Sequence, residues 1–185
     1  MNIKMANTYT QLFVHSTFSV KNRMGLILPR YKDELYKYIS GIVQNKKHRL
    51  YAIGGIENHI HLFVSMRPDV SVSNLVKDIK MNSSKWINDR RFLKTKFAWQ
   101  EGFGAFTYSI SQVDKVCKYI LNQEKHHKKM TFEEEYRKLL EKFDVKFDER
   151  YFFFDLCCYV TPTGSRIKCN EWLLTYSPSW TITEH

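Results

Sequence analysis

Four features that would assign this 185-residue chain to common protein classes are missing from it. None of its four cysteines belongs to a C-x-x-C pair, so the sequence carries no sign of a zinc ribbon, and nothing suggests a disulfide scaffold. The first ten residues, MNIKMANTYT, contain no apolar signal core, and no apolar run is long enough to span a membrane. We therefore expect a cytoplasmic protein without membrane partners.

Acidic side chains are scarce relative to basic ones. The chain has 29 Lys and Arg against 19 Asp and Glu, which gives a formal net charge of +10. An excess of this size favours a polyanionic partner, most often nucleic acid, although a basic soluble protein without such a partner can have the same charge. Apolar residues make up 43% of the chain and aromatic residues 15%, which is enough for the core of one domain.

The order of the predicted elements indicates a fold class. Apolar, β-branched and aromatic runs predict strands at 9–19, 49–57, 59–66 and 105–110, and helical spacing predicts helices at 31–48, 71–90, 111–127 and 131–143. The first six elements follow the order βαββαβ. We therefore expect an α+β protein with a ferredoxin-like (RRM-like) antiparallel sheet, two helices on one face and further C-terminal helices. The open face of such a sheet is a common platform for single-stranded nucleic acid.

Two histidines stand one residue apart in the run NHIHLFVS. Because side chains alternate faces in a strand, His59 and His61 point to one face and Ile60 and Leu62 to the other. The fold places this strand at the centre of the sheet, and two imidazoles on one face are a natural pair of metal ligands. An H-x-H triplet also arises by chance, so this motif alone leaves a purely structural role open.

A second group of polar residues lies in CKYILNQEKHH, in the third predicted helix. Tyr119 and Gln123 are four residues apart and share one helix face, and His126 and His127 follow on roughly the same side. Taken alone, Tyr119 is typical of an amphipathic core position and Gln123 of a solvent-facing one. The two histidines lie among lysines, as in a solvated basic helix end.

Together these motifs resemble those of the single-tyrosine HUH transposases. This family is encoded by small bacterial insertion sequences and by related domesticated elements, the REP-associated tyrosine transposases. HIH resembles the HUH motif, with Ile60 as the bulky apolar residue, and YILNQ resembles the nucleophile motif. KMNSSKWIN (80–88), WQEGFGAFTYS (99–109), NQEKHH and FDERYFF resemble further signatures in the same order. The resemblance defines an HUH transposase domain at 7–154, followed by an extension at 155–185 whose role is unknown.

The resemblance implies an enzyme that cleaves and rejoins single-stranded DNA beside hairpins. Tyr119 is then the nucleophile that forms a 5′-phosphotyrosine link, and His59, His61 and Gln123 hold a divalent metal, Mg²⁺ or Mn²⁺. Ligand chemistry alone leaves zinc or nickel open. Members of the family act as homodimers in which the tyrosine helix of one subunit completes the histidine pair of the other, so we expect composite sites here.

Several parts of this hypothesis stay open. His126, His127 and a metal-bound water are alternative general bases for Tyr119. A non-catalytic RRM-like binding module and a domesticated relative that cleaves repeat hairpins are alternative functions.

The predicted DNA contacts lie on the second predicted helix and just after it. The basic residues proposed to hold phosphates are Lys77, Lys80, Lys85, Arg90 and Arg91. Trp99 and Phe103 are candidates for stacking on bases, whereas core packing is favoured for Trp86 and Phe106.

Overall fold

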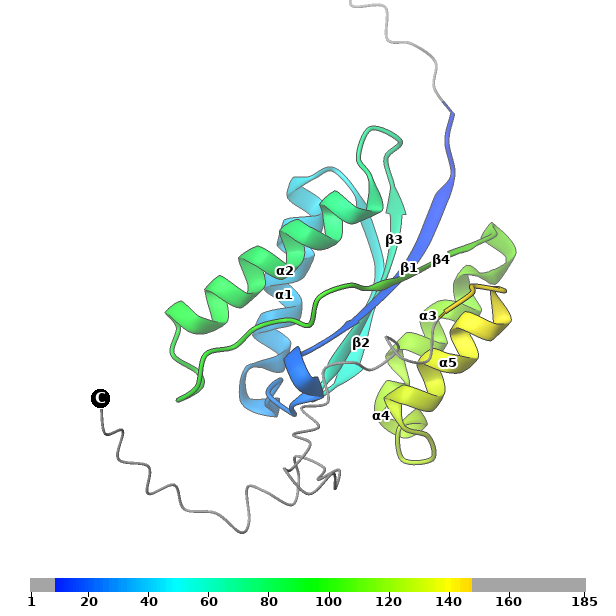
Figure 1. Cartoon of the computed structure of the whole chain (residues 1–185). Coiled ribbons are helices and arrows are strands. Elements are labelled where there is room, and N and C mark those ends of the chain that lie inside the picture. Colours follow the sequence, from blue (N-terminus) through cyan, green and yellow to red (C-terminus); the bar gives the residue numbers. More distant parts are fainter. Residues whose placement is uncertain (1–8, 148–185) are drawn as a thin grey trace, which may run out of the picture. The chain divides into compact units, whose positions relative to one another are not determined.

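The computed structural model describes residues 9–147, so the predicted domain end at 154 and the extension at 155–185 lie outside the described residues. The chain divides into two compact units, 1–145 and 146–185, and the elements described here belong to the first. The strands are β1 Leu12–Ser19, β2 Arg49–Ile56, β3 His59–Met66 and β4 Gly104–Tyr108 (Figure 1). The helices are α1 Pro29–Asn45, α2 Val72–Asp89, α3 Val113–Leu121, α4 Gln123–His126 and α5 Phe132–Lys142, with short 3₁₀ turns η1 Lys21–Arg23 and η2 Ile110–Gln112. Within 9–147, no helix is both long and apolar enough to cross a membrane.

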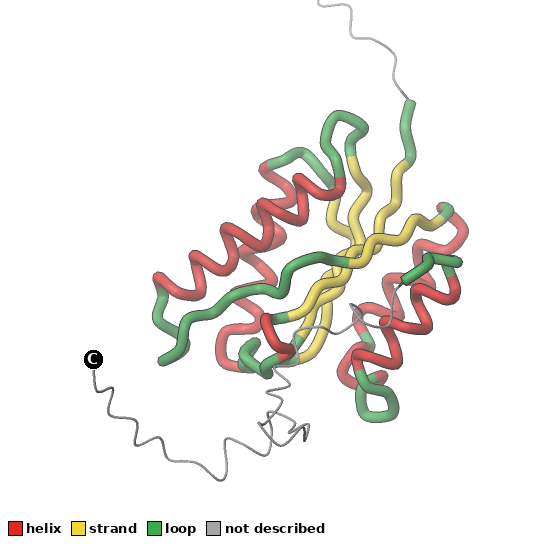
Figure 2. Tube along the Cα trace, viewed as in Figure 1, coloured by secondary structure: helices red, strands yellow, loops and turns green. Residues whose placement is uncertain are grey.

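The four strands form one antiparallel sheet in the order β2-β3-β1-β4. This order confirms the predicted α+β, ferredoxin-like class, with β1 and β3 at the centre. Phe18 of β1 lies opposite Ile60 of β3, and Thr17 lies opposite His61. Figure 2 shows the sheet in yellow between two groups of helices.

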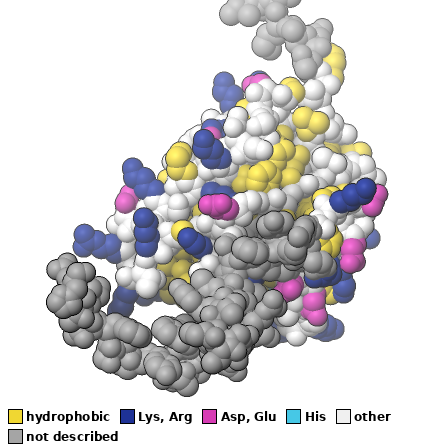
Figure 3. Space-filling model, viewed as in Figure 1, with side chains coloured by type: hydrophobic (Ala, Val, Ile, Leu, Met, Phe, Trp, Pro, Cys, Tyr) yellow, Lys and Arg dark blue, Asp and Glu magenta, His cyan; other side chains and the backbone are white. Residues whose placement is uncertain are grey.

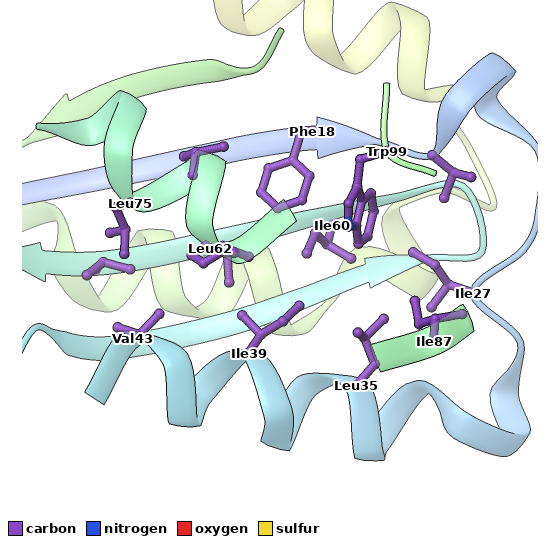
Figure 4. Packing of buried hydrophobic residues seen from close by; sticks show 14 of the residues in the cluster. Phe18, Ile27, Leu35, Ile39, Val43, Ile60, Leu62, Leu75, Ile87 and Trp99 are labelled. Atoms are coloured by element: carbon purple, nitrogen blue, oxygen red, sulfur yellow. The ribbon is translucent and has the colours of Figure 1, made fainter. Parts of the chain in front are cut away.

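The larger core lies between the sheet and the pair α1 and α2. Leu35, Ile39 and Val43 recur at helical spacing along α1 and are fully buried. They pack with residues from α2 and with the even-numbered residues of β3, Ile60 and Leu62 (Figure 4). Burying each of these aliphatic side chains stabilises the fold by about 1.5–3 kcal/mol. Most of the apolar stabilisation of the sheet therefore comes from this layer.

The other face of the sheet is not open, contrary to our expectation. Phe13 and Phe63 point to this face, and a helix must cover them because two large apolar rings in the middle of a sheet are costly to expose. α3 does so with Val116 and Ile120. The helix predicted at 111–127 is broken at Asn122, where φ is −100° and ψ is 17°, into α3 and α4.

α3 lies close to β2 at Gly54. A Cβ atom at this position would lie 2.1 Å from the backbone oxygen of Ile120. We expect Gly54→Ala to lower the free energy of unfolding by about 1–3 kcal/mol, because either α3 or β2 has to move. Gly41→Ala in α1 is the matched control, since a Cβ there meets nothing within 4 Å and alanine favours the helix. Urea unfolding of both variants measures the difference, and equal stabilities would contradict this packing of α3.

Candidate active site

β3 presents both histidines to the layer of α3, α4 and α5. His59 and His61 are fully buried on the face opposite Ile60 and Leu62, as strand alternation predicts. The ring of His59 stacks on Phe132 of α5 with centroids 4.0 Å apart. The pair therefore lies inside the protein, between the sheet and the C-terminal helices.

The break between α3 and α4 places Tyr119 and Gln123 beside these histidines. The Tyr119 ring meets the His61 ring edge-on, with centroids 5.9 Å apart. The side-chain oxygen of Gln123, which is buried, lies 3.3 Å from Nε2 of His59. The four residues singled out in the sequence therefore converge at one site.

This convergence occurs within one chain, whereas the family resemblance implies a composite site with a partner's tyrosine helix; the mixing of variants described below distinguishes the two. α3 packs on β2 and β3 of its own chain, so closely that there is no room for a Cβ atom at Gly54. The linkers from β4 to α3 and α4 are short, so the tyrosine reaches the adjacent face of its own sheet. A second subunit is not needed to bring Tyr119 to the histidines.

Glu135, which the sequence analysis missed, lies at the centre of the site. It is only 2% exposed and comes from the first turn of α5, whose start is fixed by a capping box between Thr131 and Glu134. Its Oε1 accepts hydrogen bonds from the Tyr119 hydroxyl and, at 2.8 Å, from Nε2 of Gln123.

The other oxygen of the carboxylate faces the histidines. Oε2 of Glu135 lies 3.1 Å from Nε2 of His127 and 3.2 Å from Nε2 of His61. Nε2 of His126 lies 3.3 Å from Oε1. One carboxylate therefore joins the tyrosine on one side to the imidazoles on the other.

The electrostatics of the site follow from burial and from this carboxylate. Burial raises the pKa of Glu135, but the hydrogen bond from His127 and the proximity of His61 outweigh it, so the pKa falls below its usual range and the group is ionised. Burial and the charge of Glu135 raise the pKa of Tyr119, so the phenol is protonated and donates its hydrogen. Burial, followed by the effect of His61, lowers the pKa of His59 well below its usual value, so this ring is neutral.

His127 carries the balancing positive charge. Its Nδ1 donates to the carbonyl of Met130 at 2.8 Å, and its Nε2 faces Gln123 and Glu135. Burial lowers the pKa of His127, but the hydrogen bond to Glu135 raises it by more, and the net change is upward. The buried carboxylate is thus paired, as a buried charge must be.

Both histidines of the HIH motif direct one nitrogen into the cluster. Nδ1 of His59 lies 2.7 Å from the side-chain oxygen of Asn58, and Nδ1 of His61 lies 2.8 Å from Nε2 of the fully buried His15. Since Nδ1 of His59 donates to the Asn58 oxygen, Nε2 of this neutral ring keeps its lone pair, and Nε2 of His61 keeps its own in the tautomer in which Nδ1 donates to His15. His15 and Asn58 were not predicted as site residues, and their contacts depend on pairing and turn geometry that the sequence does not show.

These residues fit a divalent cation. Among the described residues, ligand atoms of His59, His61, His127 and Glu135 all lie within 4.8 Å of one another. Nε2 of His61 is buried and makes no hydrogen bond of acceptable angle within 9–147, although Glu135 is near. Lone pairs of the His59 and His61 imidazoles and of the Glu135 carboxylate that face one another are a normal cation site, and the positively charged His127 lies beside it.

The predicted DNA contacts lie elsewhere. The five residues are on or directly after α2, on the opposite face of the sheet from the histidines: Lys77, Lys80, Lys85, Arg90 and Arg91. Lys80 differs from the other four, which are exposed. Its Nζ donates to the carbonyls of Gln100 (2.8 Å) and Gly102, and burial lowers its pKa to about 8. Figure 3 shows that Lys and Arg side chains are spread over the face drawn rather than gathered in one patch.

Of the aromatic residues predicted to stack on bases, Trp99 packs in the core instead. Trp99 is 8% exposed and packs edge-on against Phe18 in the larger core, so it is not free to stack on a base. Phe103 is partly buried against the same core. Phe106 is buried and Trp86 stacks on Tyr38, and both therefore pack inside the domain as expected.

Comparisons with known proteins bear on the family and the fold. The family model described as "Transposase IS200 like" matches residues 8–123. A solved structure described as a candidate transposase of Deinococcus radiodurans R1 has a TM-score of 0.53 and 21% identity, and the match covers 66% of this chain and 98% of that one. A REP-associated tyrosine transposase bound to a REP hairpin has a TM-score of 0.52 and 17% identity, covering 80% of this chain and 96% of that one. Among curated proteins, none matches the chain. The two structures support the fold, and because the family model spans more than half of the sequence, the chain belongs to the family of IS200-like transposases.

Proposed function

We propose that this transposase cleaves and rejoins single-stranded DNA with Tyr119 as its nucleophile. One observation carries the proposal: the Tyr119 hydroxyl donates to a buried carboxylate that also faces the histidine pair. A tyrosine held in this way has its oxygen fixed beside a cation site, as nucleophilic attack on a phosphate requires. A non-catalytic binding module has no need of an ionised carboxylate buried among four histidines, which is costly to maintain.

The reaction exchanges one phosphodiester for another. The phenolic oxygen of Tyr119 forms a bond to phosphorus while the bond from phosphorus to the 3′-oxygen breaks. Glu135 orients the hydroxyl, the phenolic proton is released to solvent, and the departing 3′-oxygen takes up a proton from solvent. The product is a 5′-phosphotyrosine link and a free 3′-hydroxyl. Attack by a 3′-hydroxyl on that link rejoins DNA and restores the phenol, so no nucleotide cofactor is consumed.

The residues that would hold the cation are His59, His61, Gln123 and Glu135. Bound there, a divalent ion acts as a Lewis acid that stabilises charge on the oxygens of the scissile phosphate. The carboxylate and amide oxygens favour Mg²⁺ or Mn²⁺ more than the histidine pair alone does. His127 supplies a positive charge beside Glu135, and Gln123 orients the carboxylate through its amide nitrogen.

The proposed substrate is DNA that contains hairpins and an unpaired cleavage site. The net charge of +10 supports a nucleic-acid partner, and the solved REP-associated transposase is itself bound to a REP hairpin. Whether the element is mobile or domesticated depends on whether such hairpins bracket the gene. The homodimer stays a prediction.

We expect the protein to cut single-stranded DNA taken from the two flanks of its gene when Mn²⁺ is present. Chelation with EDTA should stop cleavage, and a blunt duplex of the same sequence should neither be cut nor bind as tightly at matched salt. Gel separation of end-labelled strands measures cleavage, and filter binding measures affinity. Equal affinity for duplex and single strand would argue against this substrate.

Mixing two inactive variants tests whether the site belongs to one chain. The Tyr119→Phe protein keeps the cation site, and the His61→Ala protein keeps the nucleophile. In the arrangement described here every site in a mixed assembly still carries one defect, so we expect no recovery of cleavage. Mass spectrometry confirms that subunits have exchanged. Recovery to a substantial fraction of wild-type activity would mean that Tyr119 serves the histidines of a partner.

A further inference from the structure

A cavity of about 240 Å³ opens next to the proposed nucleophile, between α3 and α5. Tyr119 and Glu135 form part of its wall. Much of the remaining lining is apolar or aromatic and comes from Val116, Met130 and Leu139, with Tyr108 of β4. The volume equals that of roughly eight water molecules, which suits one planar ring system and is too small for a length of folded chain.

The charged residues that line this cavity are almost all basic. Lys115, Lys138 and Lys142 are exposed, and none of the three forms an ion pair with another described residue. Nζ of Lys142 lies 5.2 Å from the centre of the Tyr108 ring. Glu135 is the one lining carboxylate, and the histidines already pair with it. The cavity therefore combines an apolar interior with a positively charged rim.

We propose that this cavity binds an unpaired nucleobase adjacent to the scissile phosphate. The proposal rests on the proposed function, because a phosphate attacked by Tyr119 has its neighbouring nucleosides within one nucleotide of that hydroxyl. Apolar walls and an aromatic ring hold a base by stacking, and lysines at the rim hold the flanking phosphates. The proposed occupant is thus a planar aromatic base on an anionic backbone. The apolar walls match the base, and the lysines match the backbone phosphates.

Two further features fit a base. The Tyr108 hydroxyl makes no hydrogen bond to another residue of 9–147, so it is available to the polar edge of a base. A base that is paired and stacked in a duplex cannot enter a cavity in the protein surface without being extruded, at a cost of a few kcal/mol. The cavity therefore contributes to selection of single-stranded DNA at the cleavage step.

The test measures binding alone, in EDTA, so that it does not depend on cation binding or cleavage. The probes are octathymidylate and an abasic octamer with the same number of phosphates. We expect the wild type to bind octathymidylate at least about fivefold more tightly, the lower range for one base stacked on an aromatic side chain. Met130→Trp fills the cavity, and it should lose this preference while it keeps the affinity of the wild type for the abasic probe.

Two more variants separate the base from the phosphates. Tyr108→Leu removes the aromatic wall and should also reduce the preference, which keeps the test decisive if Met130→Trp does not fold. Lys138→Gln should weaken binding of both probes equally. It should also reduce the slope of log affinity against log salt concentration by about one, because one phosphate contact is lost. No preference in the wild type, or an unchanged preference in both cavity variants, would overturn the base site. A wild-type protein that shows the preference but does not cleave DNA in the presence of Mn²⁺ would instead count against the proposed function.

Discussion

Tyr119→Phe is expected to lower the rate of DNA cleavage by about 10⁴-fold or more and to leave DNA binding nearly unchanged. Removal of a covalent nucleophile has effects of this size, because the remaining groups have nothing to activate. The ring itself packs edge-on against His61 and His15, and phenylalanine keeps those contacts. Only the hydroxyl that donates to Glu135 is lost.

Tyr38→Phe is the control for this substitution. Tyr38 lies on α1, stacks on Trp86 and is on the far side of the sheet from the site. Its variant should cleave at the wild-type rate. Rates come from single-turnover cleavage of end-labelled DNA, and affinities from filter binding with the same strand. A Tyr119→Phe protein that still cleaves at a comparable rate would remove Tyr119 from the mechanism.

The second large effect is expected on cation affinity. His61→Ala should weaken Mn²⁺ binding by about 100-fold or more. Mutation of a residue that only hydrogen-bonds to a metal ligand already lowers metal affinity by about 10–100-fold, and loss of the ligand itself should cost at least as much. Gln123→Ala should cost less, since an amide oxygen is the weaker ligand and water can replace it. Glu135→Gln should approach the effect of His61→Ala, because it removes the one anionic ligand of the site.

Calorimetric titration with Mn²⁺ measures these affinities, and urea unfolding shows that each variant is folded. His48→Gln is the control, because His48 is buried elsewhere, where its Nδ1 accepts from the backbone nitrogen of Arg67. Its cation affinity should equal that of the wild type. Unchanged Mn²⁺ affinity in the His61 variant would show that the cation site is not where we place it.

The fold was predictable because its signals are local. Strand alternation and helical spacing gave the order βαββαβ, and the bounds of β3 were predicted as observed, at His59–Met66. The same alternation placed His59 and His61 on one face. The four-residue spacing that placed Tyr119 and Gln123 on one side of a helix survives the break at Asn122, and both residues face the histidines.

What was missed depends on contacts between distant elements. Glu135 is the last of three consecutive glutamates in an amphipathic helix, which is typical of a solvent-facing segment. A usable signal was present, because Glu135 shares its helix face with the buried residues Phe132 and Leu139, and a carboxylate there needs a partner. Likewise, nothing in the local pattern shows that α3 and α5 return to cover the second face of the sheet.

The predicted phosphate contacts on α2 show the same limit. Charge along a helix can be read from the sequence, but which face of the sheet the helix covers relative to the active site cannot. Lys77 and Lys85 are exposed yet lie across the sheet from Tyr119. If they bind DNA, they contact a part of it remote from the scissile phosphate. The lysines around the cavity beside Tyr119 are the nearer candidates for phosphates next to the cleavage site.

Identification of the covalent intermediate tests the central claim most directly. The protein is incubated with Mn²⁺ and single-stranded DNA from the flanks of its gene, digested with protease and nuclease, and analysed by tandem mass spectrometry. We predict one modified peptide, with a nucleotide joined through its 5′-phosphate to the phenolic oxygen of Tyr119. An adduct on any other residue, a link through a 3′-phosphate, or cleaved DNA without an adduct at any time point would contradict the account.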